Sequence, residues 1–531
     1  MANEILLDYI RHSLAHVLAS AVLEMFPEAK LGVGPVIETG FFYDFLLPRT
    51  LTPEDLKELQ KRMRKLVGQK LAFERMEMTT GEAKEFFRER KQDFKVELIG
   101  DIEKHGTTKA SEILGGTPSP GLRPPSPTRG EGKTAQSSSP RGRGEGEGQK
   151  VSLYKTGKFI DLCRGGHVEN TAEIDASGFK LDKVSGAYWR GDQNREQMQR
   201  IYGLAFEDEA GLKAHLAMMI ETEKRDHKKL GRELGLFAFS PLVGPGLPLF
   251  LPKGTVIFTE LEEFMRQEKE ARGYSFVRIP HIAKAALYKK SGHLGKYDAM
   301  MPMMTDEDGD QYVMKAMNCP HHFELYNAQP HSYRDLPYRV AETTTVYRNE
   351  KSGELSGLVR VKSLTQDDTH HFVRHDQIEA EIKMILGLME KVYSSFGFSD
   401  FLVQISVRDP KNPEKYFGGD DLWKKSEQIL IESVKEWGRP YIVEEGEAAF
   451  YGPKIDIMVK DSIGRRWQLT TVQLDFNQPE NFQMRYAGED SKEHAPAVLH
   501  VAILGSIERF MGILIEHFAG AFPLWLSPVQ V

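Results

Sequence analysis

Two pairs of side chains that could do chemistry lie in the N-terminal part of the chain. HSLAH places His12 and His16 four residues apart, and CRGGH gives Cys163 and His167 the same spacing. Residues four apart share one face of a helix, and the apolar pattern predicts a helix over residues 4–26. Either pair alone is better explained by partly exposed histidines and a buried structural cysteine. Together the four favour a site that holds zinc or orients a hydrolytic water.

A second set of possible metal ligands is spread over the C-terminal half. Cys319 lies in MNCPHH, His370 in TQDDTH, and His500 in the apolar strand VLHVAILGS. One thiolate and two imidazoles would leave a coordination position open, which distinguishes catalytic from structural zinc sites. The alternative for the first motif is a core thiol followed by surface histidines, His321 and His322. The spacing alone leaves both interpretations open.

Several arginines are placed where they could grip a phosphate group. ETTTVYRNE ends a predicted strand with Arg348 and Glu350, and the next predicted strand, VRVKSLTQDD, carries Arg360. Arg509 falls in the first turns of a helix predicted to begin after Ser506, where the helix N-terminus adds affinity for anions. A guanidinium can bind phosphate through two hydrogen bonds, although a surface salt bridge is the alternative for each arginine taken singly. No P-loop or GxGxxG motif is present.

The elements that must position these residues fall into several segments. With 531 residues the chain has room for three or four domains. Residues 115–150 contain 9 Gly, 6 Pro and 5 Ser and cannot bury a core, so we predict a disordered insert there. Its flanks, residues 1–114 and 151–235, are interpreted as one domain that ends in a charged linker helix over residues 223–237. Residues 236–531 then form a second domain.

The second domain has the pattern of an α+β fold. Helices are predicted over residues 259–272 and 377–396, and strands over residues 275–279 and 454–459. No uncharged apolar run is long enough to span a membrane. Two cysteines and the absence of a signal-peptide pattern place the protein in the cytoplasm. The net charge of -7 means that any nucleic acid must bind a local basic surface.

At this point the motifs resemble those of the threonyl-tRNA synthetases, a class II aminoacyl-tRNA synthetase family. GYSFVRIP is similar to class II motif 1, VYRNE to motif 2 and ILGSIERF to motif 3, while HSLAH, GPVIETGFFYD, YWRGD and QRIYG resemble the family's editing domain. The resemblance implies an α+β editing domain followed by a class II catalytic domain built on an antiparallel sheet. It also assigns one zinc ion to Cys319, His370 and His500.

The same resemblance implies roles for further residues. Arg348, Glu350, Arg360 and Arg509 would act on ATP, which is bound with Mg²⁺. The substrate-binding residues would be Gln366, Asp368, Tyr451, Lys454, Gln468, Thr471 and Gln473. The editing site would contain His12, His16, Tyr43, Lys95, Asp161, Cys163 and His167, with its histidines activating water without a metal ion.

The implied function is ATP-dependent activation of L-threonine, its transfer to threonine tRNA, and hydrolysis of mischarged seryl-tRNA. Zinc that binds the threonine hydroxyl would reject valine, whereas serine differs by a methyl group worth about 1 to 3 kcal/mol, so a second hydrolytic site is needed. Motif 1 implies a homodimer. No segment resembles the family's ubiquitin-like or anticodon-binding domains, so a separate anticodon-binding polypeptide is a possible partner. The alternatives are a synthetase-like paralogue that binds tRNA or regulates another protein without efficient charging, and a zinc hydrolase, which would leave the C-terminal half unexplained.

Overall fold

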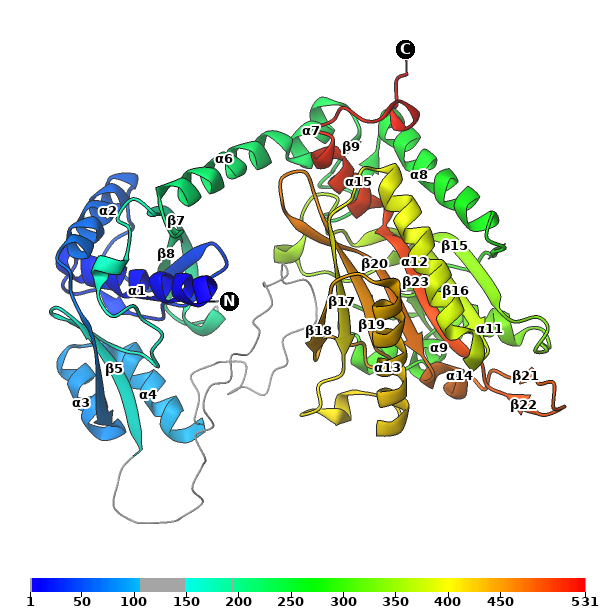
Figure 1. Cartoon of the computed structure of the whole chain (residues 1–531), viewed down its shortest axis with the longest axis horizontal. Helices are drawn as coiled ribbons and strands as arrows, with labels where there is room; N and C mark the ends of the chain where they lie inside the picture. Colours follow the sequence, from blue (N-terminus) through cyan, green and yellow to red (C-terminus); the bar gives the residue numbers. More distant parts are fainter. Residues whose placement is uncertain (1, 106–148, 193, 531) are drawn as a thin grey trace. The chain divides into compact units, whose positions relative to one another are not determined.

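The computed structural model describes residues 2–105, 149–192 and 194–530, and within them the chain forms two compact units (Figure 1). One unit comprises residues up to 219 and the other residues 220–530, so the boundary falls inside helix α6 (Glu209–Arg225). The predicted disordered insert, residues 115–150, lies outside the described residues except for its last two. None of the described helices combines the length and apolarity needed to cross a membrane.

The C-terminal unit is built on one large sheet of eight strands. Its order is β11-β15-β16-β23-β20-β19-β17-β18, antiparallel except for the β11·β15 and β17·β18 pairs. The bounds of these strands are β11 (Ser275–Phe276), β15 (Tyr338–Tyr347), β16 (Ser363–Val373), β17 (Phe401–Val407), β18 (Tyr441–Glu445), β19 (Lys454–Lys460), β20 (Arg466–Asp475) and β23 (Ala497–Ser506). The expected antiparallel-sheet domain is therefore confirmed.

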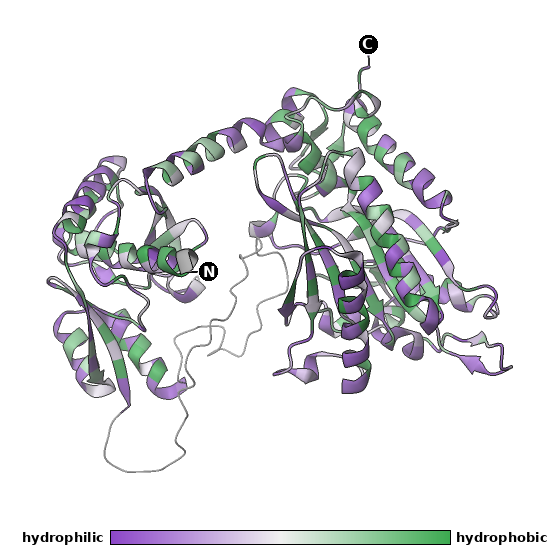
Figure 2. Ribbon diagram, in the orientation of Figure 1, coloured by the Kyte–Doolittle hydropathy of each residue, from purple (hydrophilic) through white to green (hydrophobic). Residues whose placement is uncertain are grey.

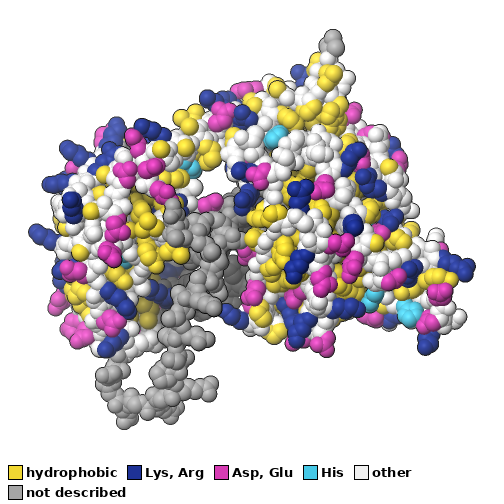
Figure 3. Space-filling model, in the orientation of Figure 1, with side chains coloured by type: hydrophobic (Ala, Val, Ile, Leu, Met, Phe, Trp, Pro, Cys, Tyr) yellow, Lys and Arg dark blue, Asp and Glu magenta, His cyan; other side chains and the backbone are white. Residues whose placement is uncertain are grey.

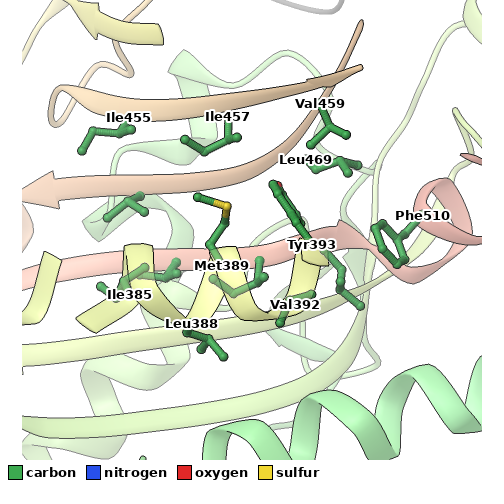
Figure 4. Packing of buried hydrophobic residues seen from close by; sticks show 14 of the residues in the cluster. Ile385, Leu388, Met389, Val392, Tyr393, Ile455, Ile457, Val459, Leu469 and Phe510 are labelled. Carbon is green, nitrogen blue, oxygen red and sulfur yellow. The ribbon is translucent and has the colours of Figure 1, made fainter. Parts of the chain in front are cut away.

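Apolar side chains on one face of this sheet form the main core. Helix α12 (Ile378–Ser395) directs Met389 and Tyr393 toward Ile457 of β19 and Leu469 of β20 (Figure 4). Figure 2 shows the same division, with hydrophobic residues along the inner strands and hydrophilic ones on the outer sides of the helices. Burial of this face is the largest favourable contribution to folding of the unit. The remaining helices of the unit are α7 (His227–Glu233), α8 (Pro252–Glu270), α9 (Ala285–Lys290), α10 (His293–Lys296), α11 (Cys319–Asn327), α13 (Asp420–Trp437), α14 (Asn477–Asn481) and α15 (Ile507–His517).

A bulge interrupts the pairing of β16 with β23. Asp368 lies opposite Ala502 but Gln366 lies opposite Ser506, so β23 carries two more residues than β16 over this stretch. The buried carboxylate of Asp367 accepts the backbone N–H groups of Ile503 and Leu504 in the bulge, both at 3.0 Å. The bulge is therefore a specified feature of the sheet, held by a side chain from the neighbouring strand.

The N-terminal unit contains two smaller sheets. The first has the order β1-β3-β8-β7, with β2 beside β3, and helix α1 (Ala2–Met25) packs against β3. The second has the order β4-β5-β6 and is accompanied by α3 (Thr80–Glu89) and α4 (Asp93–His105). The bounds of the strands are β1 (Lys30–Leu31), β2 (Val36–Ile37), β3 (Gly40–Leu46), β4 (Phe73–Thr79), β5 (Lys150–Thr156), β6 (Phe159–Leu162), β7 (Phe179–Tyr188) and β8 (Gln197–Ala205).

Several predicted elements have different bounds in the structure, among them the helix expected over residues 259–272, which is α8 and runs from Pro252 to Glu270. The charged helix predicted over residues 223–237 is broken at Asp226, whose carboxylate caps α7 by accepting from the backbone of Lys228 and Lys229. The strand expected over residues 275–279 is only β11, two residues long. Arg360 precedes β16, which begins at Ser363, so this arginine lies in the connecting loop, where its guanidinium donates to Glu350 and Glu354.

The two flanks of the predicted insert belong to one sheet. β4 pairs with β5 along their whole length, from Phe73 opposite Thr156 to Thr79 opposite Lys150. Gln149 also donates a side-chain hydrogen bond of 3.2 Å to the carbonyl of Ile102 in α4. The elements before and after the insert, α4 and β5, therefore belong to the same small α+β layer.

We expect excision of residues 117–148 to change the free energy of unfolding little, because that sequence offers almost no apolar side chains to bury. Thermal unfolding of the deletion would be compared with the parent chain. A matched positive control is Leu153→Ala, which removes a fully buried side chain of β5 and should cost about 2 to 5 kcal/mol. A deletion that destabilises the protein as much as this control would contradict the prediction.

Candidate functional site

Three side chains from separate elements of the C-terminal unit converge in its interior. Cys319 begins α11, while His370 of β16 and His500 of β23 face each other in the strand register. All three are buried, and their potential ligand atoms lie within 4.8 Å of one another. His370 Nε2 and His500 Nδ1 are 3.0 Å apart. The three predicted ligands are therefore brought together, in a donor set that fits zinc.

Neighbouring polar groups orient the two imidazoles. Asp475 at the end of β20 lies 3.1 Å from His500 Nε2, and His322 lies 2.7 Å from His370 Nδ1. Each ring therefore turns its other nitrogen toward the centre of the cluster, as in metal sites whose outer partners fix the ligand tautomer. His321 and His322 are both buried, so the alternative of surface histidines after Cys319 is wrong.

Burial favours the neutral forms of Cys319 and His370 in the protein alone. It raises the pKa of the Cys319 thiol and lowers the pKa of His370 well below the ordinary imidazole value. A divalent cation would reverse the preference of the thiol, because metal binding displaces its proton. The neighbouring Asp368 is partly buried, and its desolvation raises its pKa, while its carboxylate accepts a 2.9 Å hydrogen bond from Asn318.

A polar network beside the cluster is centred on Asp456 of β19. One of its carboxylate oxygens accepts from Gln468 at 2.6 Å and Thr471 at 2.8 Å, and the other from Lys454 at 2.5 Å. Tyr451 lies with its ring centroid 5.3 Å from that of His500. Gln473 of β20 donates a hydrogen bond to the carbonyl of Gly452. Five predicted substrate-binding residues thus lie on or beside strands β19 and β20: Tyr451, Lys454, Gln468, Thr471 and Gln473.

The predicted arginines gather at the opposite end of β23. Ser506 caps α15 by accepting from the backbone of Arg509, and the guanidinium of Arg509 donates a 3.0 Å hydrogen bond to the carbonyl of Val359. Burial and the nearby charges of Arg348 and Arg360 lower the pKa of Arg509 to about 10. The Arg509 guanidinium, whose charge is disfavoured by burial and by neighbouring arginines in the first turn of a helix, would be stabilised by a phosphate.

The remaining predicted residues of this group occupy defined places. Glu350 accepts hydrogen bonds of 2.9 and 2.7 Å from Arg360. Arg348 contacts Met317 through its guanidinium, and its Nε is buried with no described hydrogen-bond partner. Gln366 lies opposite Ser506 across the bulge, near the start of α15. The predicted phosphate-binding and substrate-binding residues therefore flank one another in the C-terminal unit.

The N-terminal unit brings its own four predicted residues together. The sulfur of Cys163 lies 3.5 Å from His12 Nε2 and 3.2 Å from His167 Nε2. His16 is buried nearby, and the potential ligand atoms of all four lie within 4.8 Å of one another. Ser13 contacts the other nitrogen of His167 at 3.3 Å. This is a second cluster, built from α1 and the loop after β6.

The four groups are uncharged near neutral pH. Burial lowers the pKa of His12, and burial with the neighbouring histidines lowers that of His167 to about 2. Burial also raises the pKa of Cys163 to about 11. Neutral imidazoles have a free lone pair, so they can accept a proton from water or a bond to a metal ion.

Tyr43, Lys95 and Asp161 form a buried triad in the same unit. Lys95 Nζ lies 2.6 Å from one carboxylate oxygen of Asp161 and donates to the Tyr43 hydroxyl at 2.9 Å. Tyr43 in turn donates to the other oxygen of Asp161 at 2.5 Å. The side chains of Lys95 and Asp161 are 3% and 2% exposed, so their opposite charges compensate each other away from water.

Several residues in these sites escaped the sequence analysis. Asn318, His322, Asp475 and Asp456 contact predicted site residues directly, and Ser13 does so in the N-terminal cluster. His293 is buried beside Tyr451, and no described residue bonds its Nε2. Adjacency to a predicted ligand was a usable signal for Asn318, His322 and Ser13. Asp456, Asp475 and His293 gave none, since their roles depend on strand pairing and packing.

Comparison with known proteins places both units. Residues 301–518 match the model of the tRNA synthetase class II core domain (G, H, P, S and T). Residues 151–202 match the threonyl and alanyl tRNA synthetase second additional domain. The chain is 46% identical to a threonine–tRNA ligase from Gloeobacter violaceus over all of this chain and 80% of that protein. It is 44% identical to one from Chloroherpeton thalassium, over 98% of this chain and 73% of that protein.

A solved structure is similar as well. The crystal structure of the RNA binding domain of threonyl-tRNA synthetase from Cryptosporidium parvum has a TM-score of 0.55 and 37% sequence identity. The match covers 57% of this chain and 74% of that one.

Proposed function

Because the chain belongs to the threonine–tRNA ligase family, we propose that it activates L-threonine with ATP and Mg²⁺, transfers it to threonine tRNA, and hydrolyses mischarged seryl-tRNA. The observation that carries this proposal is the convergence of Cys319, His370 and His500 inside the class II core. No observation favours a paralogue that binds tRNA without charging it.

Zinc is the ion that we propose for this cluster, held by Cys319, His370 and His500. When bound, it would supply a Lewis-acid position for the amino and hydroxyl groups of threonine. The protein's own contribution is to orient both imidazoles through His322 and Asp475. Asp368 would accept the substrate's ammonium group, whose charge offsets the cost of ionising this partly desolvated carboxylate.

The arginines would bind and align the triphosphate. Arg348 and Arg509 would neutralise charge that develops on the α-phosphate, and Arg360, which donates to Glu350, would lie beside them. Lys454, Gln468 and Thr471 stay in fixed positions through Asp456, so the walls of the threonine site are preorganised.

We propose that the N-terminal cluster hydrolyses seryl-tRNA. His12 would take a proton from water, since its imidazole is neutral near pH 7. The triad of Tyr43, Lys95 and Asp161 would form one wall of the same pocket. The second hydrolytic site compensates for the small difference in binding energy between threonine and serine.

The proposed activation is tested by ATP–pyrophosphate exchange dependent on threonine, with valine and serine as competing substrates. We expect exchange with threonine, weaker exchange with serine and none with valine. Removal of the metal with a chelator should abolish exchange, and zinc should restore it. Exchange that survives complete removal of the metal would contradict the zinc assignment, and its absence in the metal-loaded protein would contradict the function.

A C2 homodimer in the cytoplasm completes the proposal. Among the described strands, β11 lies at the edge of the large sheet and pairs only with β15, and Phe276 on it is 41% exposed. A free edge with an exposed aromatic residue is a surface that a second copy could cover. On the face shown in Figure 3, basic and acidic side chains are interspersed, so the tRNA that we propose as substrate would have to bind local groups of basic residues.

A further inference from the structure

His227 connects three parts of the C-terminal unit that are far apart in the sequence. It is the first residue of α7, and its side chain is 3% exposed. Its Nδ1 lies 2.6 Å from the carboxylate of Glu516 near the end of α15, and its backbone N–H donates to the same oxygen at 3.1 Å. On its other side, Nε2 accepts the backbone N–H of Leu358 at 3.0 Å. Both ring nitrogens are therefore used.

This arrangement assigns the tautomer of the ring. An N–H donor at Leu358 requires an unprotonated Nε2, so the proton lies on Nδ1 and is donated to Glu516. Although burial opposes ionisation, the hydrogen bond from His227 and the charge of Arg465 lower the pKa of Glu516. His227 is thus a neutral ring between an anchored carboxylate and a loop backbone.

The loop that His227 holds is the one that positions Arg509. Val359 follows Leu358 directly, and its carbonyl accepts the 3.0 Å hydrogen bond from the Arg509 guanidinium. Because α15 carries both Arg509 and Glu516, His227 fixes the loop against the same helix that bears the arginine. Displacement of Leu358 would move the acceptor that aims the guanidinium.

Glycines permit this close packing. Gly357 has φ +49°, and a Cβ atom there would lie 2.1 Å from His227 Nε2. Gly512 of α15 faces the same loop, since a Cβ atom there would lie 3.3 Å from Leu358 and 3.2 Å from Val359. The imidazole, the loop and α15 therefore leave no space for rearrangement around the hydrogen bond.

We propose that His227 is a positioning residue for ATP, acting through Leu358 and Val359 on the guanidinium of Arg509. The inference rests on the proposed function only for the identity of the ligand of Arg509. His227 acts through Leu358, Val359 and Arg509 and would not itself touch ATP, so it is not a catalytic residue.

Two isosteric substitutions separate this role from simple packing. In His227→Asn the amide can still donate to Glu516 but cannot reach Leu358, whereas in His227→Gln the longer side chain can accept from Leu358. We expect His227→Asn to raise the KM for ATP and the Kd for Mg-ATP about 10-fold, the equivalent of one hydrogen bond, with the KM for threonine unchanged. His227→Gln should recover most of the loss. Lys229→Asn, at an exposed position of the same helix, is the matched control and should behave like the parent.

A double-mutant cycle gives a second measurement. Gly357→Ala should also raise the Kd for Mg-ATP, because its Cβ displaces the His227 ring, and this increase should be smaller in the His227→Asn background, where the clash is relieved. Mg-ATP binding is measured by calorimetry and exchange kinetics by pyrophosphate incorporation. If the parent protein binds Mg-ATP and His227→Asn binds it with the same Kd, this inference is overturned while the proposed function stands. Equal losses for ATP and threonine would also overturn it, and a parent that binds no Mg-ATP would overturn it together with the proposed function.

Discussion

Cys319→Ser should remove the bound zinc and abolish threonine-dependent ATP–pyrophosphate exchange while the protein stays folded. A hydroxyl is a poor substitute for a soft thiolate ligand, and the serine fills nearly the same volume in the buried site. The loss should exceed the effect of Asp475→Asn, which keeps all three ligands and weakens only the outer partner of His500, at a cost of about 10- to 100-fold. Zinc content and exchange rate would be measured on the same samples.

The matched control for this prediction is Cys163→Ala. It removes the other buried cysteine, which belongs to the N-terminal cluster, and should leave zinc at the catalytic site and exchange unaffected. Full exchange activity in a zinc-free Cys319→Ser protein would show that the three residues do not form the threonine site.

The second prediction is that His12→Ala or Cys163→Ala allows seryl-tRNA to accumulate but leaves threonine activation unchanged. A positioned general base contributes about 100- to 10,000-fold to a reaction, so deacylation of seryl-tRNA should slow by at least about 100-fold in His12→Ala. Deacylation is measured on preformed seryl-tRNA, and exchange is measured separately. The separation is expected because the two clusters lie in different compact units.

Cys319→Ser is the reciprocal control for the editing prediction. It should hydrolyse preformed seryl-tRNA as fast as the parent, since its defect lies in the C-terminal unit. If His12→Ala and Cys163→Ala both deacylate seryl-tRNA at the parental rate, the N-terminal cluster is not the editing site.

The sequence predicted the possible metal ligands of both clusters, but it did not predict most of the polar residues that contact them. His12 and His16 share a helical face, and their spacing in the sequence is enough to pair them. The convergence of Cys319, His370 and His500 could be inferred only from family resemblance, because it depends on the pairing of β16 with β23 and on the placement of α11. Asp456 and Asp475 become visible only when strand register is known.

The incorrect boundaries have local physical reasons. The hydrophobic and charge patterns continue across Asp226, so residues 223–237 resemble one helix. An aspartate is also a preferred N-cap residue, however, and Asp226 caps α7 in the structure. The strand predicted for VRVKSLTQDD includes Arg360, yet this arginine lies in the loop before β16, where it forms ion pairs with Glu350 and Glu354. In both places a local side-chain contact accompanies the departure from the predicted element.

The bulge opposite Asp367 separates the two groups of candidate site residues along β23. His370 and His500 lie on one side of it, while Gln366, Ser506 and the start of α15 lie on the other. Because four steps of β23 cover the same length as two steps of β16, the two extra residues bow out of the ladder and bend β23 without lengthening it. Their loss would remove this bend and the two hydrogen bonds that Asp367 accepts from Ile503 and Leu504, and would change the direction in which β23 leads into α15. We therefore expect variants shortened here to misorient Arg509 relative to His500, and to bind Mg-ATP and threonine separately while activating threonine poorly.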